Sequence, residues 1–64
     1  MIKEFKVGDL VTHIFYKDEI GIILNKSFWR IRQKNYYQVY WRRKYLNNKG
    51  WNSMSEANLI LLTR

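Results

Sequence analysis

The stretch that decides the fold is Tyr36-Tyr37-Gln38-Val39-Tyr40-Trp41-Arg42. It is rich in the aromatic and β-branched residues that favour strands. Successive side chains of a strand point to opposite faces, so Tyr37, Val39 and Trp41 share one face. We expect this face to be buried, because Val39 stands at its centre. The opposite face then carries Tyr36, Gln38, Tyr40 and Arg42.

Other segments on both sides of this stretch also have the composition of short strands. They are residues 10–16, 20–24, 51–54 and 59–62, and residues 28–31 can extend the second of them past the polar break Asn25-Lys26-Ser27. A glycine inside a strand marks a bulge or a close backbone approach, and Gly21 has that position. Ser53-Met54-Ser55-Glu56 matches the capping-box pattern. One helical turn is therefore predicted before the last strand.

Five short strands and one helical turn predict an all-β fold, a small barrel that forms a single domain over residues 1–64. A sheet that closes on itself hides both its edges and its core. We expect Tyr37, Val39 and Trp41 to pack against Val11, Ile22 and Leu61. The alternative is an α+β fold with a helix over residues 42–49, although Asn47, Asn48 and Gly50 argue against more than one turn.

Composition excludes several classes of protein. The chain has 64 residues, no cysteine and one histidine, so it offers neither a disulfide nor a thiolate or multi-histidine metal site, and we expect no cofactor. Its hydrophobic content of 47% and aromatic content of 17% argue against disorder. No apolar run reaches the roughly 18 residues of a membrane span, and no apolar segment follows the N-terminus. We expect a cytoplasmic protein.

Charge is the strongest compositional signal. The net charge is +7, and no acidic residue occurs between residues 20 and 55. Basic and aromatic residues alternate within this window, as is typical of nucleic-acid-binding surfaces. The alternative interpretation is a solvated basic face that aids solubility.

The same window supplies the candidate site. Phosphate contacts are predicted for Lys26, Arg30, Arg32, Lys34, Arg42, Arg43, Lys44 and Lys49, and base stacking for Trp29, Tyr36 and Tyr40. Tyr36 and Tyr40 are expected to stack on successive unpaired bases. An equally good interpretation has both tyrosines cover an apolar cluster or a subunit interface.

An enzyme is not expected. His13 lies in a predicted strand and is interpreted as structural, and no serine has the setting of a nucleophile. The three glycines are too far apart for a phosphate-binding loop. Trp41 and Trp51 are candidates for the walls of an aromatic cage, although alternation with Val39 favours Trp41 in the core and the basic chain repels basic peptides.

The order of short motifs also resembles a known group of folds. Lys6-Val7-Gly8-Asp9-Leu10-Val11, Gly21-Ile22-Ile23-Leu24 and Tyr37-Gln38-Val39-Tyr40-Trp41, followed by Trp51 and Asn58-Leu59-Ile60-Leu61, are similar to the KOW and Tudor-like SH3-like barrels. They are also similar to short barrel proteins encoded by tailed phages. The opening resembles the RNA-polymerase-binding domain of CarD-type regulators, although Tyr16-Lys17-Asp18-Glu19 stands where such domains often carry His-Gly. The resemblance implies a five-stranded SH3-like barrel.

Two functions remain open at this point, because such barrels bind many kinds of partner. The first is a sequence-tolerant binder of RNA or single-stranded DNA. The second is a protein-interaction or assembly module, such as a phage-encoded adaptor, an RNA-polymerase-binding factor or a virion component. A phage-encoded chain would work in the host cytoplasm. The interleaving of charges among the aromatic residues favours the first function.

Overall fold

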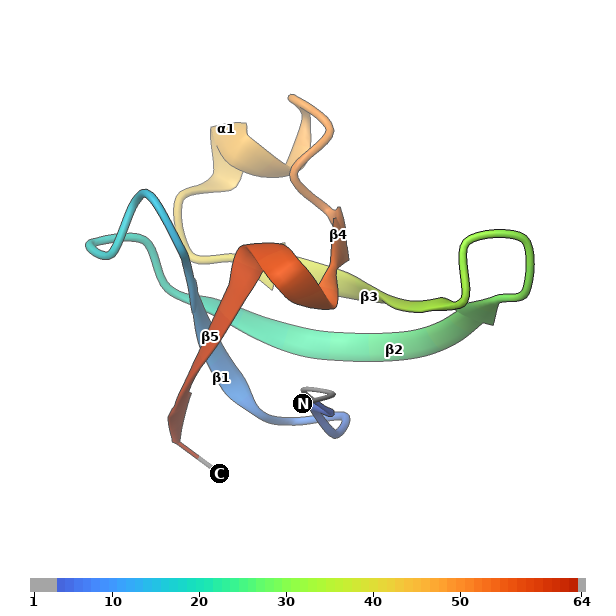
Figure 1. Ribbon diagram of the computed structural model, residues 1–64. Helices are drawn as coiled ribbons and strands as arrows, with labels where there is room; N and C mark the ends of the chain where they lie inside the picture. Colours follow the sequence, from blue (N-terminus) through green and yellow to red (C-terminus); the bar gives the residue numbers. More distant parts are fainter. Residues whose placement is uncertain (1–3, 64) are drawn as a thin grey trace.

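Five antiparallel strands form one sheet in the order β4-β3-β2-β1-β5. The computed structural model describes residues 4–63. The elements are β1 (Leu10–His13), β2 (Gly21–Trp29), β3 (Lys34–Trp41), α1 (Lys44–Asn47), β4 (Ser53–Ser55), the 3-10 turn η1 (Glu56–Asn58) and β5 (Leu59–Thr63). The turn η1 joins the two edge strands, so the sheet curls into a barrel-like shape (Figure 1). The predicted all-β fold with one helical turn before its last strand is confirmed.

The long hairpin of β2 and β3 is the largest feature of the sheet and extends beyond the other strands (Figure 1). The polar residues Asn25-Lys26-Ser27 do not interrupt β2, which runs from Gly21 to Trp29. The expected extension of this strand over residues 28–31 is confirmed for Phe28 and Trp29. The register with β3 shifts between Ile23 and Asn25, where Leu24 forms a bulge. A bulge inserts one residue into one strand, so side chains beyond it change faces.

The core face of β3 is the one predicted. Tyr37, Val39 and Trp41 are 1%, 1% and 0% exposed. The hydroxyl oxygen of Tyr37 accepts a hydrogen bond from the backbone N–H of Phe5 at 3.0 Å. The Trp41 indole N–H donates to the backbone oxygen of Trp51 at 2.6 Å. The Tyr37 and Trp41 rings are therefore buried, and the polar group of each has a hydrogen-bond partner.

The predicted partners of this face are correct only for Val11. Ile23 and Leu59 fill the core, whereas Ile22 lies opposite Tyr40 on the outer face and Leu61 is 37% exposed. The error at Ile22 arises in an uninterrupted apolar run, where nothing in the pattern shows which residues point inward. Leu61 lies on the predicted face, opposite Val11, but it remains partly exposed. Gly21 makes the expected close approach: a Cβ atom there would lie 2.6 Å from Cγ1 of Val39.

The connection between β3 and β4 is mostly turn. The α+β alternative is wrong, because the helix is limited to the single turn α1, Lys44–Asn47. Trp51 lies half-buried in a turn, so β4 begins two residues later than expected. The helical turn η1 follows β4 as predicted, but its N-cap is Ser55 and no side chain caps it. The predicted capping box between Ser53 and Glu56 therefore does not form.

Strand β1 is also shorter than expected, ending at His13 rather than at Tyr16. No helix within residues 4–63 is long and apolar enough to cross a membrane. In the same part of the chain, no three His, Asp or Glu side chains are grouped so that they could hold a metal ion.

Candidate nucleic-acid interface

Seven of the eight predicted basic residues lie in two groups near opposite ends of β3, and Lys26 lies apart from both in β2 (Figure 1). The hairpin-end group consists of Arg30, Arg32 and Lys34, in the turn after β2 and at the start of β3. The helix-end group consists of Arg42, Arg43, Lys44 and Lys49, around α1. Eight residues of extended chain separate Lys34 from Arg42, which is roughly 26 Å. The two groups therefore do not form one continuous patch.

Trp29 and Tyr36 form a partly exposed aromatic pair beside the hairpin-end group. Their ring centroids are 5.2 Å apart, and the rings are inclined at 51°. Trp29 is 54% exposed, and Tyr36 is half-buried. Lys34 lies directly opposite Trp29 in the hairpin, so its side chain shares the same outer face. Two predicted stacking residues and three predicted cations thus meet at one end of the sheet.

Tyr40 also lies on the outer face, but it is not part of this pair. Gln38 stands between Tyr36 and Tyr40, so the two tyrosines are about 13 Å apart along the strand. Successive stacked bases are only about 3.4 Å apart along a nucleic-acid strand. The Tyr36 and Tyr40 rings are therefore too far apart to stack on successive bases. The aromatic neighbour of Tyr36 is Trp29.

The surroundings of Tyr40 are apolar. Tyr40 is 46% exposed and lies across the sheet from Ile22, which in turn lies opposite Leu10 of β1. These side chains, with Ile20, Gly21 and Arg42, line a shallow hollow of about 270 Å³. Tyr40 therefore lies in an apolar cluster on this face.

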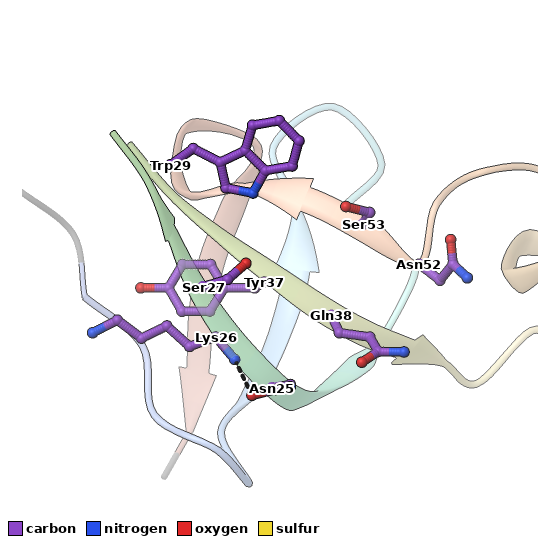
Figure 2. A pocket seen from close by; sticks show the side chains of 8 residues that line it. All are labelled: Asn25, Lys26, Ser27, Trp29, Tyr37, Gln38, Asn52 and Ser53. Carbon is purple, nitrogen blue, oxygen red and sulfur yellow. Dashed lines mark hydrogen bonds between the residues drawn. The ribbon is translucent and has the colours of Figure 1, made fainter. Parts of the chain in front are cut away.

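Between the aromatic pair and the apolar hollow lies a polar groove of about 310 Å³. Gln38 is its central residue, paired across the sheet with Asn25 of β2 and Ser53 of β4. Figure 2 shows Trp29 at one end of the groove and Asn25 at the other, with Ser27, Asn52, Ser53 and Gln38 between or beside them. All six of these residues are exposed.

Of the residues that line the groove, sequence reasoning had singled out only Trp29 and Lys26 as candidate site residues. The alternation along β3 already placed Gln38 between Tyr36 and Tyr40, so its position was available as a signal. Asn25 and Ser27 reach the outer face only because of the bulge at Leu24. Asn52 and Ser53 join the groove only through the register between β3 and β4.

Two of the predicted phosphate contacts are occupied by ion pairs. Lys26 pairs with Glu4, and Arg43 pairs with Glu19 at 3.0 Å between Nε and Oε1. The Lys26 ammonium, which donates a hydrogen bond to Glu4, lowers the pKa of that carboxyl, while the same hydrogen bond raises the pKa of Lys26. Both pairs are at the surface, so they weaken without abolishing the attraction of these cations for phosphate.

The remaining cations differ in their surroundings. The ammonium of Lys49 lies 5.7 Å from the centre of the Tyr45 ring. Within the described residues, no ion pair involves Arg30, Arg32 or Lys34. The helix-end cations other than Arg43 form no ion pair within these residues either. The feature that distinguishes the hairpin-end group is therefore the aromatic pair beside it.

His13 has the structural position that the sequence indicates. It is 8% exposed, and its Nδ1 accepts a hydrogen bond from the backbone N–H of Phe15 at 3.1 Å. Burial lowers its pKa. Its ring contacts those of Trp51 and Tyr16, with centroids 4.9 and 5.3 Å away. These rings pack on one another and Trp41 is fully buried, so the aromatic cage considered for Trp41 and Trp51 is not present.

Comparison with known proteins adds no further constraint: the chain matches no protein-family model, no curated protein and no solved structure.

Proposed function

We propose that the chain is a non-enzymatic module that binds single-stranded nucleic acid at the hairpin end of its outer face. The phosphates contact the hairpin-end group, and the bases stack on Trp29 and Tyr36. The chain would bind as a small SH3-like barrel, in line with the resemblance of its motifs.

The observation that carries the proposal is the partly exposed Trp29–Tyr36 pair beside three cations without ion pairs. Aromatic rings supply a sequence-tolerant stacking surface, and basic side chains beside them follow the phosphate backbone. Stacking of this kind needs a base whose face is free, which a single strand provides and a duplex does not. The net charge of +7 adds attraction at long range.

The salt dependence of binding tests this proposal. Each phosphate contact on a single strand releases about 0.7 counterions, so three contacts predict a log–log slope near −2. Replacing Arg30→Gln and Arg32→Gln together should flatten the slope by about 1.4. The measurement is fluorescence anisotropy of a labelled oligonucleotide over a range of salt concentrations.

The matched control is Lys44→Gln with Lys49→Gln, which removes the same charge from the helix-end group. We expect this pair to change the slope much less. Equal flattening by both pairs would indicate attraction to net charge alone and would contradict the hairpin-end site. Undetectable binding near physiological salt would exclude nucleic acid as the partner.

The apolar hollow around Tyr40 favours a second candidate function, a protein-interaction or assembly module. Leu10, Ile22 and Tyr40 expose apolar surface on an otherwise polar face. Sedimentation velocity over a range of protein concentrations tests self-assembly. An oligomer that Tyr40→Ala dissociates, in a chain that binds no oligonucleotide, would favour this function over the first.

A further inference from the structure

We propose that the polar groove beside Trp29 holds one unpaired nucleobase and discriminates between the four bases. This inference rests on the single-strand binding proposed above and goes beyond it, since stacking and phosphate contacts alone tolerate any sequence. The groove would select one kind of base, whereas the stacking and phosphate contacts of the module accept any base.

The first argument is the hydrogen-bonding capacity of the groove. An amide side chain offers donors and an acceptor, and a hydroxyl offers both as well. Within residues 4–63, the side chains of Gln38, Ser53 and Asn52 make no hydrogen bond to the protein. Their donors and acceptors are therefore open to a ligand, as base-edge recognition in unpaired strands requires.

The second argument is the geometry of the row that crosses the groove. Asn25, Gln38 and Ser53 are direct neighbours across β2, β3 and β4. Neighbouring strands are about 4.8 Å apart, so the row spans roughly 10 Å. Trp29 stands at one end of the groove, where its ring face can pack on a base whose edge meets this row (Figure 2).

The third argument is that the groove holds no free charge. Lys26 lines it, but its ammonium pairs with Glu4 and extends away from Gln38 and Ser53 (Figure 2). Arg30 and Arg32 lie in the turn beyond Trp29. A phosphate would find its cations at the turn, whereas the groove suits a neutral, planar group with a hydrogen-bonding edge. Its volume of about 310 Å³ is at the lower end of small-ligand sites.

The test compares four labelled homopolymeric single strands of equal length, one for each base, at one salt concentration. One strand should bind tighter than the weakest by roughly 5- to 150-fold, the range that one good base-edge contact supplies. Gln38→Met keeps the length of the side chain and removes its donors and acceptor. Combined with Ser53→Ala, it should reduce the difference between the strands to less than about threefold and leave the salt slope unchanged.

Asn48→Ala is the control, because it removes an exposed amide that does not line the groove, and it should keep the preference. Circular dichroism checks that each variant is folded. Equal affinity of the unmodified chain for all four strands would overturn the selective groove and leave the proposed function standing. A preference that survives Gln38→Met with Ser53→Ala would also overturn it. Absence of binding to every strand would overturn both proposals.

Discussion

Trp29 and Phe28 are neighbours in β2 with similar exposure, 54% and 59%, but they lie on opposite faces. Trp29→Ala should weaken single-strand binding by about 1–3 kcal/mol, the loss of one stacked base. The salt slope should remain, because stacking releases few ions. Phe28→Ala should leave affinity nearly unchanged. Anisotropy titrations of both variants check this, and equal losses would contradict a site on the outer face.

His13 predicts a pH dependence of stability. Burial lowers its pKa below the ordinary value of about 6.5, so the unfolded chain takes up the proton first as the pH falls. The contribution of His13 to the free energy of unfolding should be fully present above about pH 6.5. It should decline as the pH falls toward the lowered pKa of His13 in the folded state. Urea unfolding between pH 7 and pH 5 measures the effect.

The variant His13→Gln separates this titration from that of the carboxyl groups. We expect it to lose the pH dependence in that window and to bind oligonucleotides as the parent chain does. A variant that stays folded but no longer binds would contradict the structural role of His13 and reopen the question of catalysis.

Strand β2 can pack closely against the Val39 and Trp41 side chains of β3 because Gly21 has no side chain. A Cβ atom at this position would lie 2.6 Å from Cγ1 of Val39 and 2.9 Å from Cε3 of Trp41. Gly21→Ala should therefore destabilise the fold by about 1–3 kcal/mol through overpacking. Adding Val39→Ala removes the nearest clashing atom. In thermal or chemical unfolding, the double variant should lose less than the sum of the two single variants.

The single turn α1 is tied to the end of β3 by one side chain. Asn47 accepts a hydrogen bond from the backbone N–H of Trp41 at 2.8 Å and donates one to its backbone oxygen at 3.2 Å. Asn47→Ala leaves both partly buried groups without these partners, so it should cost about 1–3 kcal/mol. The neighbouring exposed Asn48 is a matched control, and Asn48→Ala should change stability by less than about 0.5 kcal/mol. Equal effects in chemical unfolding would contradict this role.

The elements differ in how much of their arrangement the sequence reveals. Strand β3 alternates between apolar and polar residues around Val39, which shows directly that Tyr37 and Trp41 point inward. The apolar run at the start of β2 does not alternate, so it contains no such information, and Ile22 was assigned to the wrong face. Leu61 of β5 was assigned to the right face, opposite Val11, but the pattern does not show that it stays 37% exposed. The site has the same limit: residue types identified Trp29 and Tyr36, but only the strand register shows that they touch.

The molecule as a whole has a large excess of positive charge. Its Cα atoms extend 30 Å along the longest axis. The Debye length is roughly 30 Å at about 10 mM salt and ~8 Å at about 150 mM. In dilute salt the charges therefore interact across the whole fold, and the net charge of +7 makes the sum of these interactions repulsive.

The melting temperature should consequently rise between these two salt concentrations. Replacing Arg30→Gln and Arg32→Gln should make the rise smaller, because these cations lie close together with no ion pair. Differential scanning calorimetry in a chloride salt measures both effects. A melting temperature that falls with added salt would show that the ion pairs of Lys26 and Arg43 outweigh the repulsion.

The bulge at Leu24 has a consequence for how such a surface can evolve. Before it, the odd-numbered residues of β2 point inward, as Ile23 does; after it, they point outward, as Asn25 and Trp29 do. Insertion or loss of a single codon at this position exchanges the side chains that the far half of the strand places on the outer face for those that it places on the opposite face. A descendant chain can thus acquire or discard an entire binding surface in one genetic step, with every other codon unchanged.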